Sequence, residues 1–169
     1  MDYIILLRGE MVIIRLWHYK LIPVLPNAML VSQWRECIAI KRQWEKGTLK
    51  HRLVSYVKDF PKILFRNYVL DIVDEMERRN IKYNDKLFDE LLEFTNDMPL
   101  KAITFFINYP THNDRYLKQC YYNLQEKYDR GIVSKEEWEL IHKNIYGLIK
   151  EYLFKEKIWK KCVKIANIG

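Results

Sequence analysis

Apolar side chains recur at helical spacing along almost the whole of this chain, and this period leaves little room for a β-sheet. The chain also has only five Gly and five Pro, too few for the many turns of an all-β fold. The segment 101–110 is ambiguous, because strand-like residues stand there between helices. We predict an all-α fold, a compact single-domain helical bundle with at most one short irregular or strand-like segment near 101–110. The predicted helices cover residues 28–45, 61–79, 84–94, 113–129 and 134–153.

Several of the predicted helix ends carry capping signals. Asn27 and Asn84 are expected to be the N-caps of the first and third helices, and Gly47 is expected to end the first. Ser134 and Glu137 have the spacing of a capping box, which opens the last helix.

The composition indicates a basic globular domain. At 169 residues the chain has the length of one domain, and 29 basic against 22 acidic residues give a net charge of +7, which favours a polyanionic partner. Cys37, Cys120 and Cys162 are odd in number and form no CxxC motif, so we expect reduced thiols. Arg8 and Glu10 interrupt the apolar N-terminus. We therefore expect a cytoplasmic protein with neither a signal peptide nor a membrane span.

One charge pair lies in an otherwise uncharged stretch. Arg35 and Glu36 are the only ionisable side chains between residues 21 and 40 apart from Cys37, and they fall inside a predicted helix. The helix neighbours three and four positions away carry no charge, so the pair is expected to meet partners from another element or a ligand. A structural ion pair and an acid/base site both remain open here, because apolar surroundings raise the pKa of a carboxyl group in either case.

Two stretches have the composition of a nucleic-acid surface. On the predicted helix 113–129, Arg115, Lys118 and Tyr122 share one face, and in the tail lysines are interleaved with aromatic residues. Lysines neutralise phosphates and aromatic rings stack on unpaired bases. Solvated helices with aromatic core residues would look the same. The four histidines show no metal-binding spacing and no glycine-rich phosphate loop is present, so we expect no metal and no cofactor.

The residues around the charge pair resemble a known family. The segment RLWHYKLIPVLP (residues 15–26), followed by LVSQWREC (residues 30–37), resembles the pyrimidine-dimer DNA glycosylases, the relatives of phage endonuclease V, and especially their prokaryotic branch. Residues 112–131 and Trp138 also resemble that branch. The resemblance implies a small, all-α, cofactor-free enzyme that combines a DNA glycosylase with an abasic-site lyase. Its nucleophile would be the chain's own N-terminal α-amine, which attacks the sugar C1′, expels the base and leaves an imine that permits β-elimination of the 3′ phosphate.

The resemblance also implies roles for individual residues. Glu36 matches the catalytic glutamate, and Arg35 matches the arginine that orients phosphate or base. Ile14 would supply the nucleophilic amine if the native chain begins there, because Arg15 matches the arginine beside the nucleophile. Lys127 matches a basic residue on a later DNA-facing helix. The residues that we expect to contact DNA are Arg15, His18, Gln33, Arg42, His112, Arg115, Lys118 and Lys127.

Two positions on the first long helix depart from the phage enzyme. Met29 stands where that enzyme has a histidine, and Ala39 stands where it has a second arginine. Part of the phage-type contact with DNA is therefore absent or rebuilt, which puts specificity for pyrimidine dimers in question even if the lyase chemistry is kept.

The start of the chain is a further departure, because fourteen residues precede Arg15. We expect residues 1–14 to be an N-terminal extension whose first ten residues are an artefact of start assignment, with Met11 and Ile14 as alternative starts. Residues 15–153 would then form the glycosylase-like domain, and residues 154–169 a basic aromatic tail.

The sequence thus predicts a monomeric DNA-repair glycosylase and abasic-site lyase. Its partner would be double-stranded DNA that carries a pyrimidine dimer, related base damage or an abasic site. The alternative is a basic, non-catalytic helical protein that binds nucleic acid on the same scaffold. A helical protein-interaction domain with a structural Arg35–Glu36 pair is a third interpretation.

Overall fold

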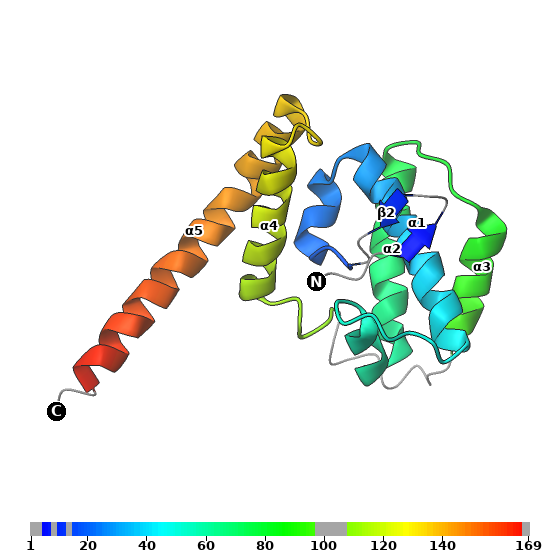
Figure 1. The fold of residues 1–169 in the computed structure, drawn as a ribbon, viewed down its shortest axis with the longest axis horizontal. Coiled ribbons are helices and arrows are strands. Elements are labelled where there is room, and N and C mark those ends of the chain that lie inside the picture. The colour runs from blue at the N-terminus through cyan, green and yellow to red at the C-terminus, as the bar shows by residue number, and fades with distance from the viewer. Residues whose placement is uncertain (1–4, 8–9, 13–14, 97–107, 167–169) are drawn as a thin grey trace.

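Helices account for most of the chain that the structure describes (Figure 1). This computed structural model describes residues 5–7, 10–12, 15–96 and 108–166. The prediction of an all-α fold is confirmed. A short antiparallel hairpin of β1 (Ile5–Leu7) and β2 (Glu10–Val12), which the sequence did not predict, precedes the helices. In chain order the helices are η1 (Tyr19–Val24), α1 (Asn27–Glu45), η2 (Ser55–Asp59), α2 (Lys62–Arg78), α3 (Asp85–Phe94), α4 (Asp114–Asp129) and α5 (Lys135–Ala166).

Two hydrophobic clusters hold these helices together. The first lies among α1, α2 and α3 and includes Leu30 and Phe65, both fully buried. The second lies among η1, α4 and α5 and includes Leu21 and Leu124. Figure 1 shows the same division, with α4 and α5 side by side as one pair and α1 to α3 grouped on the other side of η1.

The non-helical segment 15–18 passes between the two clusters. Leu16 packs in the first cluster and Trp17 in the second, so neighbouring side chains point in opposite directions. Both are buried, with 0% and 6% of their surfaces exposed. The packing of these two residues therefore holds the segment at the boundary where α1, α2 and α4 approach one another.

Most of the predicted helix ends are confirmed. The Asn84 side chain accepts a hydrogen bond from the Leu87 N–H (3.0 Å), as an N-cap does. Ser134 and Glu137 form the capping box, with their side chains and backbone N–H groups bonded reciprocally at 2.8 and 3.2 Å. Gly47 follows α1 with a φ of +66°, a conformation that glycine adopts without strain.

The last helix is longer than predicted. It runs to Ala166 rather than to about residue 153, because no Gly or Pro interrupts residues 148–166. Its second half projects past the beginning of α4 in Figure 1. None of the helices that the structure describes combines the length and the apolarity of a bilayer-spanning segment. Most of the strand-like segment predicted near 101–110, residues 101–107, lies outside the described residues.

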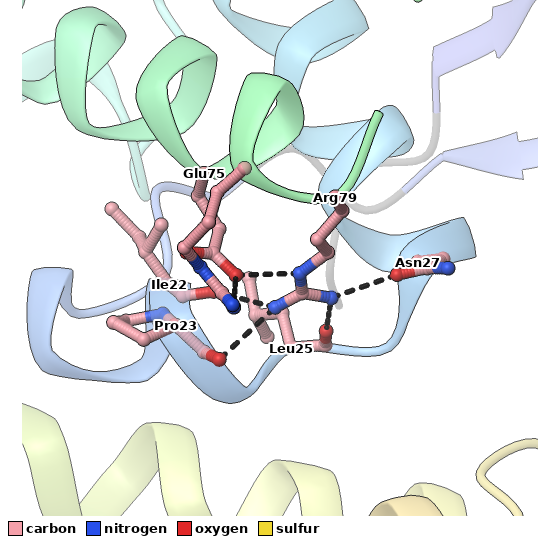
Figure 2. Close-up of polar contacts among 7 residues, drawn as sticks. Ile22, Pro23, Leu25, Asn27, Glu75 and Arg79 are labelled. Atoms are coloured by element: carbon pink, nitrogen blue, oxygen red, sulfur yellow. Dashed lines mark hydrogen bonds and ion pairs between the residues drawn. The ribbon is translucent and has the colours of Figure 1, made fainter. Parts of the chain in front are cut away.

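Arg79, the residue that follows α2, fixes the loop between η1 and α1 (Figure 2). Its guanidinium group donates to the carbonyl oxygens of Leu25 (2.6 Å) and Pro23 (3.0 Å) and to Asn27 Oδ1 (2.8 Å). Its Nε donates to Glu75, which is 7% exposed. One side chain just after the end of α2 therefore holds the loop through which the chain enters α1.

This clamp explains why one predicted cap is wrong. Asn27 is the first residue of α1 rather than its N-cap, and Pro26 occupies the capping position. The Asn27 side chain accepts a hydrogen bond from Arg79 instead of from the first turn of its own helix. A partner fifty-two residues away in the sequence has replaced the local one.

Candidate active site

Two side chains of α1 hold the backbone of the segment 15–18. The Arg15 N–H donates to Glu36 Oε2 at 3.4 Å, and the Trp17 N–H donates to Gln33 Oε1 at 3.1 Å. Glu36 and Gln33 lie one helical turn apart, so both face the same side of α1. The Gln33 amide in turn donates to Glu36 Oε2 at 3.2 Å, which links the two contacts.

Two tyrosines from other helices hold the same segment from its other sides. Tyr116 on α4 donates its hydroxyl to the Leu16 carbonyl oxygen at 2.5 Å, and Tyr68 on α2 donates to the Trp17 carbonyl oxygen at 2.9 Å. Tyr68 is almost completely buried. Because three helices supply hydrogen bonds to consecutive backbone groups, the position of this segment is determined by the tertiary structure.

The carboxyl group of Glu36 is buried at the centre of this arrangement. Its residue is 8% exposed, and burial raises its pKa to about 8, against the opposing effects of the Arg15 N–H and the Arg15 charge. The Gln33 amide and the more distant Lys127 also favour its ionised form, but more weakly. Near neutral pH both the acid and the carboxylate are therefore populated, which is the condition for donating and accepting protons in turn.

Two cationic side chains belong to this site. Arg15 is partly buried, and its guanidinium carbon lies 5.4 Å from the centre of the Trp17 ring. Lys127 on α4 is also partly buried, and its pKa is lowered by burial and then by the positive charge of Arg15. The mutual electrostatic influence of Arg15, Lys127 and Glu36 brings together three residues that the sequence had singled out separately.

The two histidines predicted to contact DNA lie inside the protein. His18 is 1% exposed and His112 is 5% exposed, and their rings are stacked with centroids 5.5 Å apart. His18 Nε2 donates to the carbonyl oxygen of His112 (2.8 Å), and its Nδ1 accepts from the Lys20 N–H (3.2 Å). Nε2 of His112 is bonded to the Tyr56 hydroxyl at 2.8 Å. Burial lowers the pKa of His18 to about 4 and of His112 to about 3, so both rings are neutral.

Gln33 is also buried, and four other predicted residues lie outside the Glu36 site. Gln33 is 1% exposed, and its amide makes hydrogen bonds inside the protein, as do the two histidine rings. A direct contact with DNA requires an exposed group, so these three side chains are not placed for the predicted contact. Arg35 is exposed and is not brought to Glu36, because consecutive residues of a helix point about 100° apart. Arg42 and Arg115 are exposed as well. Lys118 pairs with Glu156 at 3.6 Å and lies 5.6 Å from the centre of the Tyr152 ring.

Some residues of the site could not be identified from the sequence. Tyr68 and Tyr116 hold the segment 15–18, yet nothing in their spacing separates them from the other tyrosines, of which the chain has twelve. The only signal was that each lies on the apolar face of a predicted helix while carrying a hydroxyl that needs a partner. Ile14, the predicted position of the nucleophilic amine, lies outside the described residues.

An open surface pocket lies away from this site, between η1 and α2. Its volume is about 370 Å³, and five of its eight lining residues are charged. Among the described residues, no three His, Cys, Asp or Glu side chains gather closely enough to hold a metal ion. The residues that line the pocket are Tyr19, Lys20, Ile22, Pro23, Asp71, Asp74, Glu75 and Arg78.

A comparison with family models bears on this arrangement. Residues 14–89, a little under half of the chain, match the family described as pyrimidine dimer DNA glycosylase, which confirms the resemblance noted in the sequence. The matched range contains the segment 15–18, Gln33 and Glu36, but neither Lys127 nor Tyr116. No curated protein and no solved structure gives a significant match to the chain.

Proposed function

Because residues 14–89 match the pyrimidine dimer DNA glycosylase family, we propose that the protein is a DNA-repair glycosylase that also has abasic-site lyase activity. Its substrate would be double-stranded DNA carrying a pyrimidine dimer, related base damage or an abasic site. The observation that carries the proposal is the contact of the Arg15 backbone N–H with Glu36 Oε2 at 3.4 Å. It sets a buried carboxyl group beside the first residues of the matched range.

The proposed nucleophile is an α-amine at residue 14. Covalent geometry keeps the nitrogen atoms of successive residues within about 4 Å of each other, so an amine there would lie close to Glu36. An α-amine has a pKa of about 7.7–8.0, which leaves a useful neutral fraction at cellular pH. The neutral amine would attack the sugar C1′, and the base would leave with the electron pair of the glycosidic bond. Loss of a proton from the adduct and ring opening would then give an imine.

Glu36 is the proposed acid/base group of this reaction. Its pKa of about 8 leaves the acid form able to protonate a leaving group or the sugar ring oxygen. The carboxylate form could then accept the C2′ proton whose loss drives elimination of the 3′ phosphate, and it would stabilise positive charge on the sugar in between. The positive charges of Arg15 and Lys127 would bind the phosphates beside the extruded nucleotide.

A borohydride trapping experiment tests this proposal. The full chain and a form whose first residue is Ile14 would each be incubated with a duplex that contains an abasic site, and the imine would be reduced to a stable adduct. We expect the form that begins at Ile14 to be trapped, and Glu36→Gln in that form to lose strand cleavage while still binding DNA.

The other outcomes separate the alternatives. Trapping of both forms would mean that the extension leaves the site accessible or that another amine serves as nucleophile. Tight, salt-sensitive binding without an adduct in either form would favour the non-catalytic nucleic-acid-binding protein. Negligible binding would favour the third interpretation, a protein-interaction domain. The monomeric state and the cytoplasmic location stay predictions.

A further inference from the structure

Gln33 uses both ends of its amide inside the protein. It is 1% exposed, its Oε1 accepts from the Trp17 N–H at 3.1 Å, and its Nε2 donates to Glu36 Oε2 at 3.2 Å. The two ends of the amide cannot be exchanged, because the backbone N–H needs an acceptor and the carboxyl oxygen is offered a donor. Gln33 thus connects the segment 15–18 directly to the carboxyl group of Glu36.

The contact makes the two carboxyl oxygens of Glu36 unequal. Oε2 accepts from both the Arg15 N–H and the Gln33 amide, at 3.4 and 3.2 Å. No hydrogen bond to Oε1 is formed by the residues that the structure describes. An oxygen that already accepts two N–H groups is the poorer place for a proton, so a protonated Glu36 carries its proton on Oε1.

We propose that Gln33 is a positioning residue, which holds Glu36 so that Oε1 is the oxygen that donates and accepts protons next to the segment 15–18. The inference rests on the proposed function for its catalytic meaning. The arrangement of Gln33, Trp17 and Glu36 does not depend on that function, however, and it can be tested without substrate.

The other groups that face Glu36 set the background for such a test. Arg15 and Lys127 are the cations that act on Glu36 from outside α1. Cys37 on α1 and Tyr68 on α2 are titratable neighbours, and burial raises the pKa of both far enough to keep them neutral. Cys37 and Tyr68 are therefore uncharged near pH 8 and add no titration step of their own there. A change in the titration of Glu36 after substitution of Gln33 therefore reports the loss of the amide contact.

The first experiment follows Glu36 itself in the full chain. Carboxyl carbons of glutamate would be labelled with ¹³C, and the Glu36 signal would be assigned by its loss in Glu36→Gln. In Gln33→Met, which keeps the length of the side chain, the carboxylate loses a donor, so we expect the pKa of Glu36 to rise by about one unit. The matched control is Gln43→Met, on the same helix but away from Glu36, which should leave the titration unchanged.

A second readout tests the inequality of the two oxygens. The C=O stretch of protonated Glu36 reports hydrogen bonds accepted by its carbonyl oxygen, which is Oε2 if the proton is on Oε1. This infrared band, assigned again with Glu36→Gln, should move to higher frequency in Gln33→Met and not in Gln43→Met. Gln33→Asn serves if Gln33→Met does not fold, because it adds no charge and its amide is one methylene too short to keep both contacts.

Activity separates this inference from the proposed function. On abasic DNA, Gln33→Met should lower kcat at neutral pH with little change in KM and should displace the pH–rate profile together with the Glu36 titration. An unchanged titration and an unchanged infrared band in both Gln33 variants would overturn the inference, whatever the activity. Shifts of both signals in a protein that never forms the imine would uphold the positioning of Glu36 and would reject the lyase function.

Discussion

Two consecutive residues of α1, Arg35 and Glu36, have opposite surroundings. Arg35 points to solvent, whereas Glu36 points inward, where it meets the Arg15 N–H and the Gln33 amide. The charge closest in sequence is therefore not the one that acts on the carboxyl group. Instead Arg15 and Lys127, which are far apart in the chain, supply the positive potential at Glu36. Both are cations that DNA phosphates would also attract.

A substitution of Lys127 tests whether this side chain contacts a DNA phosphate. We expect Lys127→Gln to weaken binding of an abasic-site duplex and to lower the slope of log K against log salt by about one. Lys86→Gln removes the same charge from an exposed site on α3 and should leave both quantities nearly unchanged. Fluorescence anisotropy at several salt concentrations measures them. If both variants lost the same amount of binding affinity and salt dependence, the effect would be one of overall charge, and Lys127 would not contact a phosphate.

At the scale of elements, the position of α1 relative to the segment 15–18 depends on a clamp from α2. Arg79 binds the carbonyl oxygens and the side chain of the loop that separates them, and its own side chain is only 15% exposed. A planar guanidinium group reaches several acceptors at once, which a lysine ammonium group cannot reproduce in the same geometry. The loop thus owes its shape to a residue outside it.

We expect Arg79→Lys to lower the free energy of unfolding by about 1 kcal/mol, because several acceptors, the partly buried Leu25 carbonyl oxygen among them, lose a donor at once. Arg78→Lys is the matched control. The Arg78 side chain is 65% exposed and bonds only to Glu75 among the described residues, so its replacement should change stability very little. Urea denaturation compares the two. Similar midpoints for both variants would show that the loop holds its shape without the clamp.

At the scale of the whole molecule, the buried titratable groups have opposite effects on the folding stability as the pH changes. Glu36 has a pKa of about 8 in the folded protein, against an ordinary value of 4.5. The stability that protonated Glu36 contributes is therefore lost as the pH rises from 4.5 to about 8. His18 and His112 stay neutral when folded, although unfolded histidine takes up a proton below pH 6.5. Their contribution is lost as the pH falls below 6.5.

These opposite signs predict a maximum of thermal stability near pH 6.5, where the histidines of the unfolded chain begin to titrate. Glu36→Gln should remove the decline above that pH and should stabilise the protein by on the order of 2 kcal/mol at pH 8. Melting temperatures between pH 5 and 8.5 check this, with Glu90→Gln on α3, a partly exposed glutamate, as the control. If Glu36→Gln melted in parallel with the parent protein at every pH, the raised pKa would be rejected.

The local signals in the sequence were enough to predict the α-helices and most of their ends, but not the 3-10 helices η1 and η2. Asn84, Gly47 and the Ser134–Glu137 box act through partners within a few residues, so their effect can be read from a short stretch of chain. Asn27 could not be assigned in that way, because its partner Arg79, just after α2, lies 52 residues away in the sequence. The extent of α5 was underestimated, since a pattern without Gly or Pro contains no signal to stop.

The sequence by itself determined the helical period, the family resemblance, which the family model matches over residues 14–89, and the choice of Glu36 as the candidate catalytic residue. Only the tertiary structure decided which groups surround Glu36. The backbone of Arg15, the amide of Gln33 and the charge of Lys127 meet there because helices of two separate hydrophobic clusters close on the segment 15–18. Periodicity reports only which face of a helix is buried, whereas the partner of a buried polar group depends on how the helices pack.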